Sequence, residues 1–462
     1  MKKLALIFTV LLMALSIPIQ ASAASLYEVR QALKNYYYGE VNGDIYDAQS
    51  IDELMQMIKD PYTVYFTSEE YRQFFQSIEQ ETVGIGVVVE THIQGIYISD
   101  VLANGPASTA GLKSGDIITH ADGVSLVGIS LSEAVGYITG DVNTSVTLTI
   151  LRNDGSSNTV NLVRKTIQSP NTVSSLLYGN VGYIHLASFS EKAAEEVSNA
   201  IGNLKKQGAT KFIFDLQNNG GGYVATAIDI ISLFPNAKNA FVLHDVDGVT
   251  TYSVKQNMSY KARSYYKFPT DVSLLINGAS ASASDMTAGA IKDQKLGTIY
   301  GSTSYGKGLM QRIEPFRDGS ALKVTTAEFR TPNGNVINEV GIKPDVETRT
   351  PIEAAHFDFI KSQLTKFKQL KALQNVPQNK TFTISLTKDV DAKSVANAIE
   401  LVKLGGSSID ITTKVVGSKI SVTPKQALTA QSQYVLVVHP TIKNTQGKAL
   451  KTGRFMHITV AK

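Results

Sequence analysis

The chain of 462 residues contains no cysteine and no tryptophan. The lack of cysteine excludes a disulfide framework, a thiolate metal site, a cysteine nucleophile and a lipid-modified N-terminal cysteine. An excess of charge of one sign is also lacking, because 44 Lys+Arg face 40 Asp+Glu. Composition therefore gives no reason to expect nucleic acid or an anionic membrane as a partner. Any nucleophile must be Ser, Thr, Lys or a carboxylate.

Long apolar runs are scarce, and the one that stands out runs from Leu4 to Ile19 at the N-terminus. It follows Lys2 and Lys3 and precedes Ala21-Ser22-Ala23, which is the three-part pattern of a secretory signal peptide. A membrane anchor is the alternative, but the run is shorter than the ~20 residues of a spanning helix. We expect cleavage near Ala23 and a protein that works outside the cytoplasmic membrane, at the cell surface, in the cell wall or in the periplasm.

The rest of the chain divides into four regions that differ in composition and in the spacing of apolar residues. The first has the apolar spacing of two or three amphipathic helices, and the second has short alternating runs separated by Gly-Asp turns. The third alternates apolar strand runs with helical segments, which is an α/β signature. The fourth has short alternating strands, and a Lys/Gln/Asn/Pro-rich stretch, Lys366–Lys380, precedes most of it as a candidate linker. The predicted boundaries are 1–23 for the signal peptide, 24–81 for the helical region, 82–167 for the β-rich module, 168–370 for the α/β core and 371–462 for a β-sandwich with its linker.

A glycine-flanked loop opens the β-rich module at Gly84, Ile85, Gly86 and Val87. Glycine permits backbone conformations that turn successive N–H groups toward one point, which is a nest for a carboxylate. Turn geometry without a ligand is the alternative. The ordered set G-I-G-V, A-G-L-x-x-G-D and D-G that follows resembles a PDZ domain, and this resemblance places a C-terminal-carboxylate-binding loop at these four residues.

A serine-rich turn follows the apolar run Val272–Ile276. The turn, Ala279-Ser280-Ala281-Ser282-Ala283-Ser284-Asp285, leads into good helix formers, and a sharp strand-to-helix turn exposes a side chain beside helical N–H groups. The alternative is an ordinary helix cap, because Ser282 and Asp285 also fit a capping box. The local sequence does not choose between Ser282 and Ser284 as a nucleophile.

A lysine flanked by glycines follows, in Gly306-Lys307-Gly308. These neighbours allow backbone to approach closely on both sides, which suits burial. A lysine that acts as a general base must be neutral, and lowering its pKa from about 10.4 to about 7–8 costs on the order of 3–5 kcal/mol. Gln311 is four residues further on, on the same face of either a helix or a strand, where its amide could orient the amine. The seven histidines lie in no motif, so we expect no histidine-based triad.

A polar, glycine-rich turn follows the apolar run Phe212–Leu216, and it contains Gly220, Gly221 and Gly222. Such a turn can present a backbone N–H to an oxyanion. A phosphate loop or a plain tight turn are the alternatives, but neither a P-loop Lys-Ser/Thr nor the rest of a dinucleotide fingerprint follows.

Taken together, these motifs resemble the carboxyl-terminal processing proteases, secreted serine endopeptidases with a Ser-Lys pair and an inserted PDZ domain. The resemblance implies a crotonase/ClpP-like α/β protease core with a helical N-terminal arm. By motif position it implies Ser282 as the nucleophile, Lys307 as the general base, Gln311 as the residue that positions the base, and the N–H groups of Gly221 and Ala283 as the oxyanion hole. The matching motifs are D-P-Y-T-V-Y-F from Asp60, the PDZ elements, D-L-Q-N-N-G-G-G from Asp215, S-A-S-A-S-D from Ser280, Y-G-K-G from Tyr305 and G-I-K-P-D-V from Gly341.

The last region resembles bacterial immunoglobulin-like domains of surface proteins and is expected to be an all-β sandwich. We expect polypeptides with accessible C-terminal tails as substrates, no cofactor and no metal. By family analogy the N-terminal helices are candidate dimerisation elements, and the C-terminal domain is a candidate cell-wall contact or else a spacer. Two alternatives remain: a catalytically silent binding scaffold that keeps the protease fold, and a crotonase-type acyl enzyme.

Overall fold

The computed structural model describes residues 24–103 and 105–462, so the predicted signal peptide lies outside the described residues. Two compact units form: the described residues up to Gln73 together with Gln311–Thr326, and Phe74–Met310 together with Ala327–Lys462. Within the described ranges, no helix combines the length and the apolarity that a membrane crossing requires.

The first unit is the predicted helical arm. Helix α1 begins after Ser25, whose side chain accepts a hydrogen bond from the Glu28 N–H while the Glu28 carboxylate accepts one from the Ser25 N–H, a complete capping box. The arm packs around Val29, Leu33 and Leu54, with Leu322 and Val324 of strand β18 in the same core. The elements of this unit are α1 (Leu26–Tyr36), α2 (Ile51–Gln56), β1 (Val64–Phe66), the start of α3 (Ser68–Ile78), much of β17 (Leu309–Pro315) and the first part of β18 (Ala321–Arg330).

The predicted β-rich module is the first part of the second unit. Its sheet has the order β3-β4-β5-β7-β8, with β6 paired to β5, so β3 is an edge strand. Strands β2 and β9 pair with each other as an antiparallel ribbon at the two ends of the module. The elements are β2 (Glu81–Gly84), β3 (Val87–His92), β4 (Gly95–Val101), α4 (Pro106–Thr109), β5 (Ile117–Ala121), β6 (Val124–Ser125), α5 (Leu131–Ile138), β7 (Ser145–Leu151), β8 (Ser157–Val163) and β9 (Lys165–Gln168).

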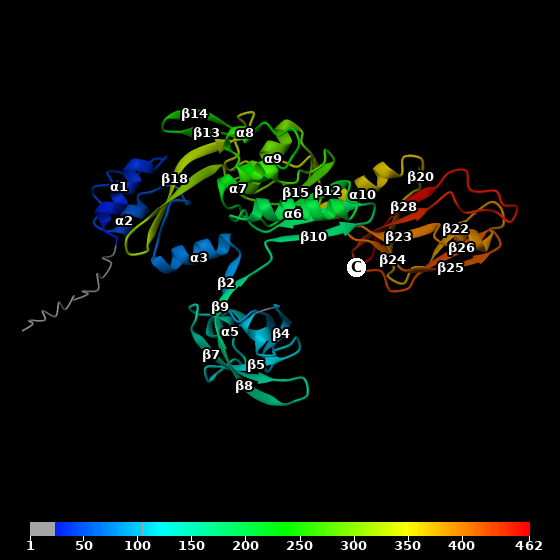
Figure 1. Cartoon of the computed structure of the whole chain (residues 1–462), viewed down its shortest axis with the longest axis horizontal. Coiled ribbons are helices and arrows are strands. Elements are labelled where there is room, and N and C mark those ends of the chain that lie inside the picture. The colour runs from blue at the N-terminus through cyan, green and yellow to red at the C-terminus, as the bar shows by residue number, and fades with distance from the viewer. Residues whose placement is uncertain (1–23, 104) are drawn as a thin grey trace, which may run out of the picture. The chain divides into compact units, whose positions relative to one another are not determined.

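The α/β core is a six-stranded sheet in the order β10-β11-β12-β15-β16-β19, covered by helices on both faces (Figure 1). Successive side chains of a strand point to opposite faces of the sheet, so both faces carry apolar side chains. Phe212 and Phe214 of β12 pack in the cluster with α6, α7 and α9. Ile213 packs in the cluster with α10. The strands are β10 (Thr172–Leu177), β11 (Val181–Leu186), β12 (Lys211–Asp215), β15 (Val272–Ile276), β16 (Thr298–Gly301) and β19 (Val346–Glu347), and the helices are α6 (Ala193–Lys206), α7 (Val224–Ile231), α9 (Ala283–Gln294) and α10 (Pro351–Gln363). The remaining elements are β13 (Asn239–Asp245) and β14 (Gly248–Ser253), which pair with each other, α8 (Val254–Asn257) and the 3₁₀ helix η1 (Lys261–Ser264).

The C-terminal region is the expected sandwich of two sheets, drawn in orange and red in Figure 1. The predicted linker Lys366–Lys380 is wrong as a linker, because it supplies two strands, β20 and β21, that pair in parallel with β28. Leu373 and Val376 are three residues apart, and a register irregularity between them lets both side chains join the sandwich core despite the polar composition of the segment. The elements are β20 (Lys368–Gln369), β21 (Leu373–Val376), β22 (Phe382–Ser385), η2 (Ala392–Val395), β23 (Ile399–Lys403), β24 (Ser408–Ile409), β25 (Ile411–Val416), β26 (Lys419–Pro424), β27 (Gln433–Val438) and β28 (Arg454–Val460).

The sandwich is docked on the α/β core through a buried histidine, His356 of α10. Its Nδ1 accepts from the Gly405 N–H at 2.9 Å, and its Nε2 lies 2.9 Å from the Tyr178 carbonyl oxygen. Because the first contact needs a lone pair and the second needs a proton, the ring is neutral with the proton on Nε2. Burial lowers the pKa of His356, which favours the same state. An apolar cluster surrounds this contact, formed by Ile360, Val402, Leu404, Val435, Val437 and Phe455.

Candidate active site

The serine-rich turn lies where the fully buried strand β15 gives way to helix α9. Ser282 immediately precedes the helix and has φ 56° and ψ −107°, a backbone conformation that is costly for a residue with a Cβ. Strain of this kind persists where surrounding structure holds a nucleophile at the top of a strand-to-helix turn. The geometry at Ser282 therefore agrees with the prediction that a sharp strand-to-helix turn exposes a side chain here.

Burial distinguishes Ser282 from Ser280 and Ser284, whereas the local sequence does not. Ser280 and Ser284 are 0% exposed, and their hydroxyls donate to the carbonyl oxygens of Leu216 and Asn219 at 2.8 and 2.9 Å. Ser282 is partly exposed. A hydroxyl that holds a buried carbonyl is unsuited to attack a substrate, so Ser282 is the one serine of the turn placed to act as a nucleophile.

A buried carboxylate, Asp285, connects Ser282 to the lysine segment. Its Oδ2 accepts from the backbone N–H of Ser282 at 2.7 Å and from that of Lys307 at 3.0 Å. Its Oδ1 accepts from Ser304 Oγ at 2.5 Å and from the Gly306 N–H at 3.1 Å. Burial raises the pKa of Asp285, and the four hydrogen bonds to the carboxylate oppose that shift. One side chain thus fixes the backbone of both predicted catalytic residues.

The glycines on either side of Lys307 are required by close backbone packing. A Cβ on Gly306, which has φ +84°, would lie 2.6 Å from the Gly341 nitrogen, and one on Gly308 would lie 2.5 Å from the Asn338 nitrogen. The predicted close approach is therefore present. Lys307 itself is only partly buried.

Gln311 lies in strand β17, whereas Lys307 lies before that strand. Lys307 lies in a loop two residues before β17, so the argument that the two residues share one face of a helix or strand is wrong. The loop shape follows from the hydrogen bonds to Asp285. In the first unit, Gln311 Nε2 donates to Thr325 Oγ1 at 3.3 Å. Its predicted role in positioning the base stays a prediction.

The glycine-rich turn lies directly against Ser282. A Cβ on Gly221, which has φ +108°, would be 2.8 Å from Ser282 Cβ and 3.1 Å from the Ala283 nitrogen, so only glycine fits there. The Ala283 N–H belongs to the first residue of α9 and has no partner within the helix. The Gly221 N–H, however, donates to Asn219 Oδ1 at 2.9 Å, so in this conformation it is engaged within the chain.

Sequence reasoning missed two residues of this site. The sequence indicates Asp285 only as a helix cap. An acid at the third position of a helix that follows a candidate nucleophile could have indicated a residue of the site. Asn219 is 0% exposed, and its Nδ2 donates to the Leu186 carbonyl oxygen at 2.9 Å while its Oδ1 holds Gly221. The contact with Gly221 is only two residues away, but no local pattern indicates the donation to Leu186, which is 33 residues away.

The predicted carboxylate loop borders a hollow in the PDZ-like module. The hollow has a volume of about 230 Å³, and Gly84, Ile85, Gly86 and Val87 all line it. Val135 and Ile138 of α5 form the opposite wall, and Thr139 lies at its end. Gly86 has φ +81°, and its carbonyl oxygen accepts from the Leu102 N–H at 3.0 Å, which holds the loop in place. The four residues singled out from the sequence therefore share one apolar site beside an edge strand.

Three family models match successive parts of the chain. They are described as peptidase family S41 over residues 180–348, PDZ domain over 73–151 and bacterial Ig-like domain over 370–456. These ranges correspond to the α/β core, the β-rich module and the sandwich. The expected fold class is thereby confirmed.

Curated relatives and solved structures are similar over most of the chain. Probable CtpA-like serine proteases of Staphylococcus epidermidis and Staphylococcus aureus are each 32% identical, over 366 and 369 residues, covering 79% of this chain and 69% of the relative. A photosystem II D1 C-terminal processing protease matches with a TM-score of 0.44 and 22% identity, covering 72% of this chain and 95% of that chain. A putative S41 protease from Bacteroides fragilis matches with a TM-score of 0.48 and 15% identity, covering 72% and 91%. From the family models and the CtpA-like relatives we conclude that the chain belongs to peptidase family S41, and within it to the CtpA-like serine proteases, the C-terminal processing peptidases with an inserted PDZ domain.

Proposed function

We propose that this peptidase is a secreted endopeptidase that binds polypeptide C-terminal tails through its PDZ domain and cleaves with a Ser282–Lys307 pair. The observation that carries the proposal is the double hydrogen bond of Asp285 Oδ2 to the backbone N–H groups of both residues. Proximity held by a buried group supplies the orientation that nucleophilic catalysis needs. Gln311 is the residue that we expect to orient the lysine amine.

In the proposed reaction, the neutral Lys307 amine accepts the proton of Ser282 Oγ as the oxygen attacks a peptide carbonyl carbon. The resulting oxyanion is stabilised by the N–H groups of Ala283 and Gly221. The Lys307 ammonium then returns the proton to the leaving amine, and water hydrolyses the acyl-enzyme. The second oxyanion donor is free to act only after the Gly221 N–H leaves Asn219 Oδ1.

Labelling with a serine-directed fluorophosphonate probe tests this assignment on the full chain. Ser282→Ala should abolish labelling and cleavage, and Lys307→Ala should remove cleavage while circular dichroism shows an intact fold. Ser284→Ala is the matched control, since its hydroxyl donates to Asn219 O inside the protein and it should keep labelling. Retained cleavage in the Lys307 variant would contradict the pair, and an unlabelled wild-type chain would favour the scaffold alternative.

Binding of tails by the PDZ domain is supported by the apolar hollow at Gly84–Val87 beside the edge strand β3. An extended peptide can add to such an edge while the loop holds its terminal carboxylate. Amidation of a test peptide removes the carboxylate charge and should abolish binding. Equal affinity of the acid and the amide would refute carboxylate recognition.

Secretion after cleavage near Ala23 is supported by a contact of the residue that would become the new N-terminus. The Ala24 nitrogen lies 2.7 Å from Asp318 Oδ2, so a free α-ammonium at this position would form an ion pair. N-terminal sequencing of the protein recovered from outside the cytoplasm should begin at Ala24. A retained Met1 would contradict the proposal.

The remaining partner proposals are a homodimer through the N-terminal helices and cell-wall contact through the C-terminal domain. Sedimentation of the purified chain tests the first, and a monomer at all concentrations would contradict it. Co-sedimentation of the intact chain with purified cell walls tests the second, and full recovery in the supernatant would count against it.

A further inference from the structure

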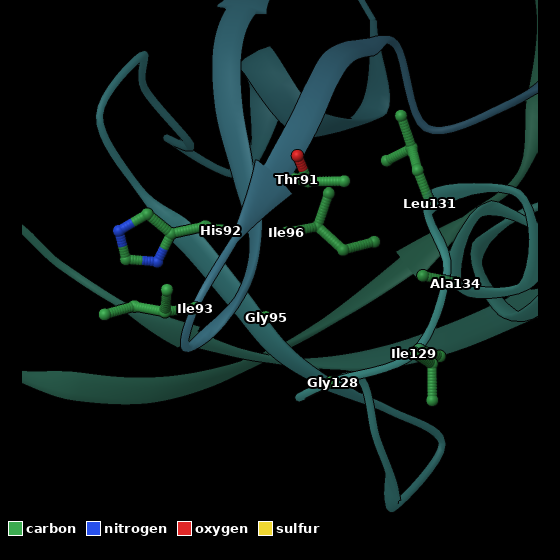
Figure 2. A pocket seen from close by; sticks show the side chains of 9 residues that line it. All are labelled: Thr91, His92, Ile93, Gly95, Ile96, Gly128, Ile129, Leu131 and Ala134. Carbon is green, nitrogen blue, oxygen red and sulfur yellow. The ribbon is translucent and has the colours of Figure 1, made fainter.

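A second hollow, lined by both apolar and polar groups, lies on the PDZ domain at the other end of helix α5. It has a volume of about 150 Å³ and lies between the β3–β4 hairpin and the start of α5 (Figure 2). Ile96 and Ala134, each 1% exposed, line its buried side. Ile129 and Leu131 line it further, and Ile93 of the hairpin tip is 86% exposed. No Asp, Glu, Lys or Arg side chain lines this hollow.

The two hollows lie along the same strand and the same helix. Residues Val87–Val89 of β3 line the first hollow, and Thr91 and His92 line the second. On α5, Leu131, Val135 and Ile138 follow the spacing of one helical face, with Leu131 at the second hollow and the other two at the first. The two hollows therefore follow one another along the edge strand.

The register of an added strand relates the hollows to positions in a bound tail. A peptide paired antiparallel with β3 rises about 3.4 Å per residue, and every second side chain faces the helix. If the C-terminal side chain lies opposite Val87, the side chain opposite Thr91 belongs to the fourth residue before it. That residue is about 14 Å away and faces α5, since four is an even number of steps.

We propose that the second hollow is a distal subsite that binds an apolar side chain at the fourth residue before the C-terminal residue of the tail. This inference rests on the proposed tail binding and narrows its substrate class to tails with apolar residues at both positions. Burial of a Leu side chain favours binding, because it removes apolar surface from water. For a partly open hollow we expect Leu to bind about tenfold tighter than Ser at that position, which corresponds to about 1.4 kcal/mol.

Fluorescence anisotropy with the full Ser282→Ala chain tests the subsite without cleavage. The probes are eight-residue peptides with the same apolar C-terminal residue and a free carboxylate, and they differ only in Leu or Ser at the fourth residue before the last. An amidated copy of the Leu peptide is the third probe. We expect the Leu peptide to bind about tenfold tighter than the Ser peptide, and the amide not to bind.

Two surface variants localise the effect. Ile93→Ser removes an exposed side chain of the second hollow and should reduce the Leu preference to less than about threefold. Val124→Ser, on β6 and 40% exposed, is the matched control and should keep the preference. Equal binding of the Leu and Ser peptides, with the amide still excluded, would overturn the distal subsite and leave carboxylate recognition intact. Failure of every peptide to bind, or equal binding of the amide, would overturn the tail-binding proposal and the subsite with it.

Discussion

Replacement of Asp285 by Asn is the sharpest test of how this active site is held together. The carboxylate accepts two hydrogen bonds on each oxygen, from Ser282 and Lys307 on Oδ2 and from Ser304 and Gly306 on Oδ1. An amide keeps one oxygen and sets an NH₂ group against the other pair of partners. Facing Ser282 and Lys307 it loses two hydrogen bonds, and facing Gly306 and Ser304 it loses one, because the Ser304 hydroxyl can turn and accept from the amide.

The magnitude follows from the number of bonds lost. Hydrogen bonds to a charged group contribute about 1.5–3 kcal/mol each, so the loss of one or two gives a gross loss of about 1.5–6 kcal/mol. Removal of the buried charge recovers part of its desolvation cost, so we expect the free energy of unfolding to fall by about 3 kcal/mol. A displacement of the catalytic groups by about 1 Å lowers the rate on the order of 100-fold, which is the expected loss in kcat and in fluorophosphonate labelling.

The controls separate positioning from folding. Asp293→Asn makes the same change on the same helix, where the carboxylate is more exposed and accepts from the Asn333 N–H, and it should keep activity. Asp285→Glu keeps the acceptors and should retain more activity than Asp285→Asn. Ser304→Ala removes one donor to Asp285 together with the acceptor of the Ile342 N–H, and its activity should be intermediate if Asp285→Asn fails to fold. A folded Asp285→Asn variant with wild-type labelling would refute the reasoning.

Two further predictions concern stability. Because the pKa of His356 is lowered in the folded chain, the unfolded chain binds the extra proton, and stability is lost as pH falls from about 6.5 toward the folded pKa, by about 1.4 kcal/mol per pH unit. Thermal unfolding against pH should show this loss reduced in His356→Gln, whose amide can replace both hydrogen bonds, and an unchanged slope would contradict it. Gly220→Ala should stabilise the chain by about 0.4–1 kcal/mol, because a Cβ at that position meets no atom within 4 Å. Lower activity together with a lower unfolding midpoint would show that the turn needs glycine there.

Module order and the types of the site residues could be predicted from the sequence, because they depend on local patterns. The strand Val181–Leu186 appears with the predicted bounds, and helices follow Glu191, Tyr223 and Ser282 as expected. Apolar alternation and helix-forming runs act over a few residues, so they are visible without a fold. The prediction that Lys366–Lys380 is a linker is wrong because local patterns do not show its pairing partner. That partner, β28, is about 85 residues away.

The sequence by itself determined which chemistry was available: no thiol, a serine at a strand-to-helix turn, and a lysine between two glycines. Only the tertiary structure distinguished the serines of the turn, because the hydroxyls of Ser280 and Ser284 donate to carbonyl oxygens more than 60 residues away. It likewise decided that Asp285 joins Ser282 to Lys307, and that the Gly221 N–H is held by Asn219. These properties depend on contacts between distant segments, and such contacts exist only once the sheet and its helices have packed.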